Sequence, residues 1–115
     1  MSVTIYHNPR CSKSRQTLAL LEERGADPQV IEYLKTPPTA AELKAVLKML
    51  GMRPRDLMRR NEAPYKELGL GDDSLSDDAL IEAMVENPIL IERPVVVKDG
   101  RAAIGRPPES VVEIL

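Results

Sequence analysis

The region that most constrains the fold is residues 94–104, where two apolar runs flank an Asp-Gly pair. Residues 94–98 are Pro-Val-Val-Val-Lys, Asp99 and Gly100 follow, and residues 101–104 are Arg-Ala-Ala-Ile. An Asp-Gly pair suits the two central positions of a type I′ turn, because both positions require a positive φ. The sequence therefore predicts a β-hairpin whose strands are joined by a two-residue turn.

The N-terminal third has the pattern of a strand, a helix and a second strand. Residues 3–6 are β-branched or aromatic, residues 12–24 contain good helix formers and end at a glycine, and residues 29–33 again favour a strand. The Asn8-Pro9 pair separates the first strand from the helix, because proline disfavours a helical conformation at the residue before it. A strand–helix–strand unit implies a parallel strand pair with a right-handed crossover.

Helices are predicted for most of the stretch between these two regions. Apolar residues recur there at helical spacing, and Thr39 followed by Glu42 forms a capping box. The predicted elements are a helix at 39–51, a short helix at 54–60, a loop at 64–71, a helix at 76–86 and, after two prolines, a closing helix at 109–114. This order predicts an α/β protein with a thioredoxin-like fold, which has a helical insertion between strand 2 and the C-terminal β-hairpin and forms a single domain over residues 1–115.

The composition argues against several classes of partner. The formal net charge is -2 over 115 residues, so neither a nucleic acid nor an anionic membrane surface is an expected partner. No stretch approaches the roughly 20 apolar residues that span a membrane. The single cysteine cannot form an internal disulfide and no apolar leader opens the chain, so we expect a cytoplasmic monomer. One histidine and one cysteine cannot close a zinc site, and we expect no bound metal.

Cys11 is the candidate functional residue, because it lies where the first strand gives way to the first helix. A thiolate there would face the unpaired N–H groups of the helix and the positive end of its dipole. His7, Arg10 and Arg15 are near in sequence, and such surroundings lower a thiol pKa. The alternative is a buried structural cysteine. A position after Asn-Pro-Arg at the start of a helix favours a nucleophile.

The residues that follow Cys11 restrict the chemistry of this thiol. Cys11-Ser12-Lys13-Ser14 is a C-x-x-S motif, in which Ser14 replaces the second thiol of a dithiol oxidoreductase. Any redox cycle must therefore be closed by an external thiol. The spacing from Cys11 to Arg15 is C-x3-R, which does not match the C-x5-R loop of cysteine phosphatases.

The segment 7–15, His-Asn-Pro-Arg-Cys-Ser-Lys-Ser-Arg, resembles the active-site signature of glutaredoxin-coupled arsenate reductases, a family with a thioredoxin-like fold that is related to the Spx proteins. Further matching blocks lie at residues 57–61, 64–70, 87–94 and 105–109, so the resemblance spans essentially the whole chain. It implies an oxidoreductase of arsenic detoxification that reduces arsenate to arsenite. A cysteine thiolate attacks arsenate, glutathione as co-substrate displaces the arsenic, and glutaredoxin clears the mixed disulfide. No bound cofactor is implied.

The resemblance also implies roles for individual residues. Cys11 matches the nucleophile. Three arginines match the residues that hold the oxyanion, namely Arg59, Arg93 and Arg106, and three further residues match those that support the thiolate, namely His7, Ser14 and Arg15. Guanidinium groups suit a tetrahedral anion because they carry a fixed charge on fork-shaped donors. Thioredoxin folds commonly have a cis-proline at the position of Pro94, so we expect a cis Arg93-Pro94 bond.

Each of these assignments has an alternative. An arginine is more often a solvated surface charge, and a loop histidine often only bonds the backbone. Arg10, Ser12 and Lys13 stand where the best-characterised reductases carry a small residue and Gly-Thr. A general monothiol oxidoreductase that uses glutathione would need the same cysteine but not the arginines. A regulator that binds RNA polymerase, as Spx proteins do, is a further alternative, although Spx switches commonly use a C-x-x-C pair that this chain lacks.

Overall fold

A computed structural model describes residues 3–115 of the chain, which divide into two compact units. The first unit combines the segments before Pro37 and after Glu92, and the second unit is Pro37–Glu92. The first unit contains the sheet and the second is helical. That residues 1–115 form a single domain stays a prediction, which joint unfolding of the two units would support.

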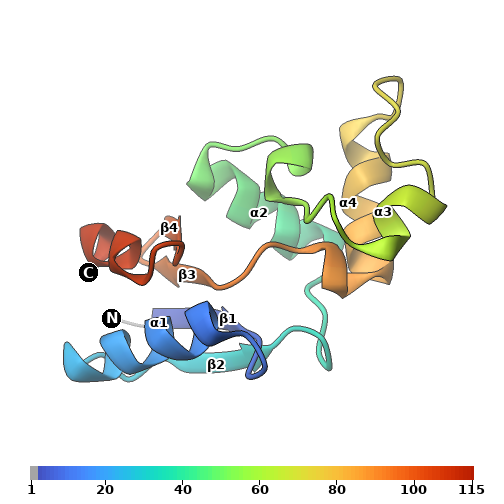
Figure 1. Ribbon diagram of the computed structural model, residues 1–115. Coiled ribbons are helices and arrows are strands. Elements are labelled where there is room, and N and C mark those ends of the chain that lie inside the picture. The colour runs from blue at the N-terminus through green and yellow to red at the C-terminus, as the bar shows by residue number, and fades with distance from the viewer. Residues whose placement is uncertain (1–2) are drawn as a thin grey trace. The chain divides into compact units, whose positions relative to one another are not determined.

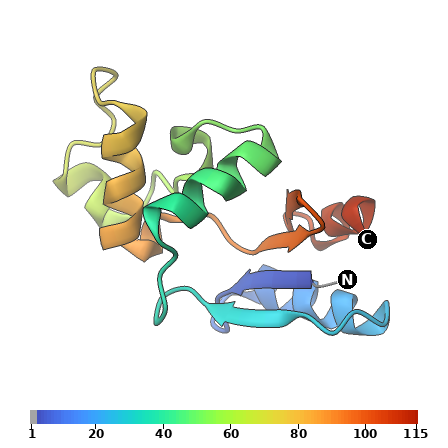
Figure 2. The same ribbon diagram turned by 180° about the vertical axis from the view of Figure 1, so that it is seen from behind.

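The first unit is built on a four-stranded sheet in the order β2-β1-β3-β4, shown from opposite sides in Figures 1 and 2. Its strands are β1 (Val3–His7), β2 (Gln29–Glu32), β3 (Val95–Lys98) and β4 (Arg101–Ile104). β1 and β2 are parallel, and helix α1 (Ser12–Glu23) connects them. The other two pairs are antiparallel. This is the predicted thioredoxin-like α/β arrangement, and the predicted parallel pair is confirmed.

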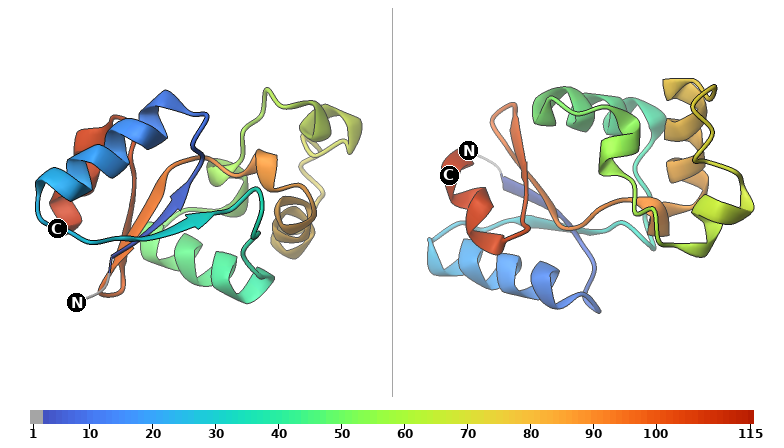
Figure 3. Two further views of the ribbon diagram at one scale, coloured as in Figure 1. Left: turned by 90° about the horizontal axis from the view of Figure 1, so that it is seen from below. Right: turned by 45° about the horizontal axis from the view of Figure 1, so that its top comes forward.

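Helix α1 and the C-terminal 3-10 helix η3 (Pro108–Ile114) lie side by side against the sheet (Figure 3). Between them and the strands is a core of aliphatic side chains, namely Val3, Ile5, Leu21, Val96, Val111 and Ile114. Burial of such side chains provides about 1.5–3 kcal/mol each, so this cluster fixes the helix against the strands. The first turn of α1 is thereby held beside the end of β1.

The predicted hairpin is confirmed in its strands and in its turn. Val95 pairs with Ile104 and Lys98 with Arg101. Asp99 has a φ of 50° and Gly100 a φ of 77°, as a type I′ turn requires. The closing helix is wound more tightly than predicted, because the segment after the two prolines forms 3-10 turns, with three residues per turn, rather than an α-helix.

The second unit is a cluster of short helices, with α2 (Ala40–Leu50), the 3-10 helix η1 (Pro54–Leu57), α3 (Ala63–Glu67), α4 (Asp77–Glu86) and the 3-10 helix η2 (Pro88–Leu90). Helices α2 and α4 pack together, and η1 and η2 contact α4. The predicted capping box of α2 is confirmed, since Thr39 and Glu42 form it, and the side chain of Ser76 caps α4. No helix among residues 3–115 is long and apolar enough to cross a membrane.

Two predictions for this unit are wrong. The short helix predicted at 54–60 ends at Leu57, because Met58 forms a β-bridge with Ile91 and the chain becomes extended. The first four residues of the loop predicted at 64–71 belong to helix α3, which begins at Ala63. Pro64 there does not interrupt a helix but lies in its first turn, where proline is tolerated because the missing N–H would have no partner.

Candidate active site

The loop between β1 and α1 places Cys11 at the N-cap of the helix. The backbone N–H of Cys11 donates to the carbonyl of Asn8 at 3.0 Å, and the side-chain oxygen of Asn8 accepts from the N–H of Arg10 at 3.0 Å. Cys11 has extended backbone angles, φ -94° and ψ 123°, as an N-cap residue does. Cys11 thus lies at the start of the helix, as the sequence predicts, and the residue is half-buried.

The pKa of the Cys11 thiol lies below its ordinary value. Burial raises this pKa and is the largest single influence on it, but four groups lower the pKa and together outweigh burial. These are the backbone N–H of Ser14, the charge of Arg93, the backbone N–H of Lys13 and the side chain of Arg106. The sulfur completes no cap hydrogen bond of standard geometry, so the two N–H groups act on it as oriented dipoles.

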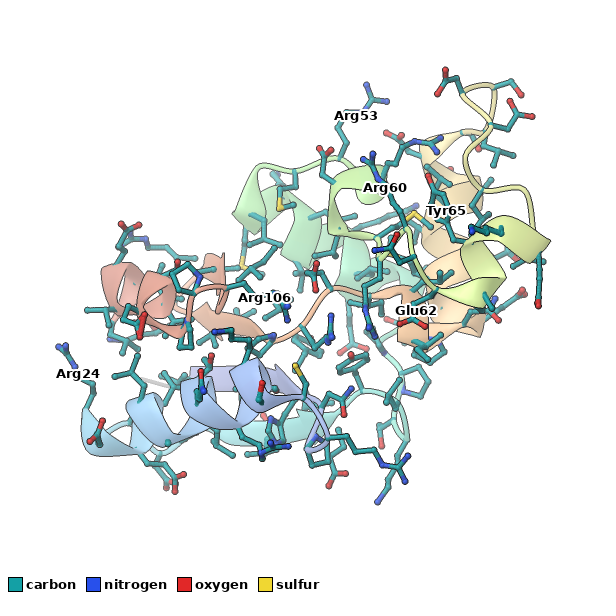
Figure 4. The ribbon with its side chains drawn as sticks, in the orientation of Figure 1. Arg24, Arg53, Arg60, Glu62, Tyr65 and Arg106 are labelled. Carbon is teal, nitrogen blue, oxygen red and sulfur yellow. The ribbon has the colours of Figure 1, made fainter. Side chains whose placement is uncertain are left out.

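Arg106 and Arg93 are both brought to the thiol by the hairpin. In Figure 4 the side chain of Arg106 extends from the segment that follows β4. Its Nη1 lies 3.8 Å from the sulfur of Cys11 and donates to the carbonyl of Arg93 at 3.3 Å. Residues more than 80 positions apart in the sequence thus meet at one sulfur. The predicted cis Arg93-Pro94 bond is confirmed, and Arg106-Pro107 is a second cis bond.

His7 and Ser14 form a buried polar pair behind the loop. His7 Nδ1 lies 2.6 Å from Ser14 Oγ, which also accepts from the N–H of Asn8 at 3.0 Å. Burial lowers the pKa of His7, the charge of Glu32 raises it and the charge of Arg15 lowers it, and the result lies below the ordinary value. Near neutral pH His7 is therefore uncharged, and its ring nitrogen bonds the Ser14 hydroxyl.

Arg15 braces the same loop from the helix. Its Nη1 donates to the carbonyl of Pro9 at 2.9 Å, although the side chain is exposed. The structure thus gives His7, Ser14 and Arg15 contacts with the loop that carries Cys11.

Arg59 lies in the second unit and has a carboxylate partner there. Its Nη2 lies 2.6 Å from Glu62 Oε1, and both side chains are about one-fifth exposed, at 21% and 24%. Nη1 donates to the carbonyl of Ile89 at 3.4 Å, and the backbone N–H of Arg59 donates to the carbonyl of Leu90. The sequence analysis did not predict the ion pair with Glu62. An arginine and a glutamate three positions apart are common in sequences, and nothing in this sequence indicates that Arg59 and Glu62 form an ion pair.

Two further residues in the first unit were missed by the sequence analysis. Thr17 and Gly105 are buried and lie against each other. Thr17 is one helical turn after Ser14, and Gly105 directly precedes Arg106. The only sequence signal is a glycine that directly follows a predicted strand. Among residues 3–115 no group of three or more histidine, cysteine or acidic side chains is arranged to hold a metal ion.

Fold and site together define a class of protein: a thioredoxin-like α/β protein that presents one thiol of lowered pKa at a helix N-terminus, beside guanidinium groups. Comparison with known proteins gives the family. The model of the ArsC family matches residues 6–114, so the chain belongs to the ArsC family.

Individual relatives agree with this family. An Escherichia coli (strain K12) relative named "Uncharacterized protein YfgD" is 62% identical over 114 residues, which cover 98% of this chain and 96% of that protein. An arsenate reductase of Rhizobium meliloti (strain 1021) is 50% identical over 115 residues, with 100% of this chain and 82% of that protein covered. The solved structure of an arsenate reductase from Vibrio cholerae has a TM-score of 0.97 and 62% identity, with 100% of this chain and 98% of that chain covered.

Proposed function

We propose that this protein reduces arsenate to arsenite in the cytoplasm, with Cys11 as the nucleophile. The observation that carries the proposal is the position of Arg106, whose Nη1 lies 3.8 Å from the sulfur of a thiol with a lowered pKa. A guanidinium beside a thiolate can bind an oxyanion against that thiolate. Membership of the ArsC family and the similarity to proteins named arsenate reductase support arsenate as that oxyanion.

In the first step the thiolate of Cys11 attacks arsenic(V). An S–As bond forms, an As–O bond breaks, and the oxygen leaves as water after taking up protons from solvent. Arg93 and Arg106 hold the remaining arsenate oxygens, because their fork-shaped donors match a tetrahedral anion and their charge offsets its negative charge. In the family assignment Arg59 is the third arginine of this set.

In the second step the thiolate of glutathione attacks the sulfur of Cys11. A disulfide forms between the two, and the electron pair of the S–As bond stays on arsenic, which becomes arsenic(III) and leaves as arsenite. The two thiols supply the two electrons. Because the chain has no second cysteine, a thiolate of glutaredoxin then attacks the glutathione sulfur and releases Cys11.

The remaining site residues keep the loop in place for these steps. Ser14 joins His7 and the Asn8 N–H, and Arg15 holds the carbonyl of Pro9. We propose that they act on the thiolate through the loop, since His7 is uncharged near neutral pH.

A coupled assay tests the proposal. Purified protein is incubated with arsenate, glutathione, glutaredoxin, glutathione reductase and NADPH, and arsenite is quantified together with NADPH consumption. We expect turnover that Cys11→Ser abolishes. Turnover no higher than that of Cys11→Ser would contradict arsenate reduction. In a parallel assay without glutaredoxin, which by itself reduces glutathione mixed disulfides, a glutathionylated peptide replaces arsenate. Turnover with the peptide alone, unchanged in Arg93→Ala and Arg106→Ala, would indicate a general monothiol oxidoreductase instead.

A further inference from the structure

We propose that Thr17 and Gly105 are positioning residues, whose close contact sets the Arg106 guanidinium beside the Cys11 sulfur. This inference rests on the proposed function of Cys11 and Arg106. It identifies the contact that keeps the guanidinium of Arg106 within 3.8 Å of the Cys11 sulfur.

Position 105 requires glycine because a larger residue has no room there, and not because the backbone has a positive φ. A Cβ atom at this position would overlap Oγ1 of Thr17, and it would lie 2.9 Å from Cγ2 of Thr17 and 2.8 Å from Cγ of Pro94. Four of the other glycines have a positive φ and nothing within 4 Å of such an atom, and at Gly71 the nearest atom is 3.7 Å away. Of the six glycines in the chain, only Gly105 has neighbouring side chains that would clash with an added Cβ atom, and they lie on two sides of it.

Thr17 ties this glycine to the first turn of α1. Its side chain is fully buried, and its hydroxyl donates to the carbonyl of Lys13 at 2.8 Å. The same oxygen lies 3.4 Å from the carbonyl oxygen of Gly105, in a two-acceptor arrangement. That carbonyl belongs to the peptide group that leads into Arg106. One hydroxyl therefore links the helix turn beside Cys11 to the peptide before Arg106.

The opposite side of Gly105 is fixed by the hairpin. Its N–H donates to the carbonyl of Pro94 at 2.9 Å, which continues the pairing of β3 and β4 beyond Val95 and Ile104. Gly105 is thus held between Thr17 and Pro94, with Arg106 after it and Arg93 before Pro94. An added methyl group must push these segments apart. Because Nη1 already lies 3.8 Å from the sulfur, a displacement of about 1 Å removes the contact.

The test measures the reactivity of Cys11, which needs no arsenate and is unambiguous because the chain has one cysteine. The rate of alkylation by iodoacetamide is measured against pH, and thiolate absorbance gives a second reading of the midpoint. We expect Gly105→Ala to raise the midpoint by roughly one pH unit, because the thiolate loses a nearby cation. Gly71→Ala is the matched control, since it adds the same methyl where there is room.

Thr17 provides a second arm that adds no bulk. Thr17→Val removes the hydroxyl at nearly constant volume and should raise the midpoint, whereas Thr17→Ser keeps the hydroxyl and should leave it close to the wild-type value. If Gly105→Ala fails to fold by circular dichroism, the two Thr17 variants decide the matter. Thr17→Ala added to Gly105→Ala removes two of the three close contacts and should bring the midpoint partly back.

The decisive comparison is made in an Arg106→Ala background. If the contact acts by placing Arg106, Gly105→Ala and Thr17→Val cause no further shift there. An equal shift in that background, or an unchanged midpoint in both folded variants, would overturn the inference and leave the contact a purely structural one. Absence of arsenate turnover in the wild type would not affect this result, so the two proposals fail separately.

Discussion

Arg106 and Arg59 belong to different compact units and differ in what their guanidinium groups contact. Arg106 lies 3.8 Å from the sulfur of Cys11 and 3.3 Å from the carbonyl oxygen of Arg93. Arg59 lies 2.6 Å from a carboxylate oxygen of Glu62 and 3.4 Å from the carbonyl oxygen of Ile89.

This difference shows how little the residue type alone says about function. Glu62 offsets the charge of Arg59, and a further anion must share the guanidinium with it or displace it. Arg106 instead faces the sulfur of Cys11, which is an anion when the thiol is deprotonated, and this contact helps to lower the pKa of the thiol. We therefore expect Arg106 to affect both the thiol and the oxyanion, and Arg59 to affect the oxyanion alone.

The largest effect is expected for Arg106→Ala. A hydrogen bond to a charged group is worth about 2 kcal/mol, so KM for arsenate should rise about 30-fold. The pH midpoint of Cys11 alkylation should also rise, because the guanidinium contributes to the lowered pKa. Both are measured on the same preparation, with steady-state kinetics for the first and iodoacetamide for the second.

Arg101→Ala is the matched control for this variant, since Arg101 begins the same strand, β4, and is exposed. A change in KM without a change in the midpoint would show that Arg106 contacts the oxyanion but not the thiolate. That result would remove the contrast with Arg59.

A smaller effect is expected for Arg59→Ala. Because the charge of Arg59 is already offset by Glu62, KM for arsenate should rise about tenfold, near 1.4 kcal/mol, and the alkylation midpoint of Cys11 should stay at the wild-type value. Arg60→Ala, an exposed neighbour, serves as the control. A midpoint that rises as far as in Arg106→Ala would contradict the distinction between the two arginines.

The sequence predicted the part of the site that depends on local rules. Asn8-Pro9 and the helix formers after it place Cys11 at a helix start, and the Asp-Gly turn brings the flanks of the hairpin together. Both features are short-range and follow from turn and capping chemistry. The family resemblance added the cis Arg93-Pro94 bond, which the structure contains.

The contacts that were missed are long-range or depend on side-chain partners. The Thr17–Gly105 contact joins residues 88 positions apart, and a glycine needed for close packing looks the same in sequence as one needed for a turn. The pairing of Arg59 with Glu62 depends on how the chain turns after Met58. Helix α3 was missed because proline occurs both in loops and in the first turn of helices, so Pro64 does not by itself mark the start of a helix.

A third prediction concerns His7, the basic side chain near Cys11 whose pKa is lowered by burial. The pKa of His7 is lowered in the folded state, whereas in the unfolded chain it is near 6.5. As the pH falls through 6.5, the unfolded state takes up a proton that the folded state resists, so the free energy of unfolding decreases, by at most about 1.4 kcal/mol per pH unit. Above that pH this contribution is absent.

Urea unfolding between pH 7.5 and 5.0 measures this slope in the wild type and in His7→Asn, whose amide oxygen can replace Nδ1 as acceptor. Because His7 is the only histidine, the variant should have the flatter slope, whatever its absolute stability. Equal slopes would show that His7 titrates as freely in the folded protein as in the unfolded chain. His7 would then add a further positive charge near Cys11 at slightly acidic pH.

The smallest effect is expected for Glu62→Gln, which tests the comparison most directly. The change removes the carboxylate charge 2.6 Å from Arg59 and keeps the shape of the side chain. A partly exposed ion pair is worth up to about 1 kcal/mol, so release of Arg59 should lower KM for arsenate roughly threefold. Glu67→Gln, an exposed residue on α3, makes the same change of charge and controls for it.

The two effects of Glu62→Gln can be separated in an Arg59→Ala background. If the carboxylate acts by occupying Arg59, the variant lowers KM only when Arg59 is present. If it acts only as a distant negative charge, KM falls equally in both backgrounds, and Glu67→Gln has a similar effect. Protection of Cys11 from alkylation by inorganic phosphate gives the same comparison without turnover. A threefold gain confined to the Arg59 background would show that the partner of an arginine, and not the arginine alone, sets its contribution to the site.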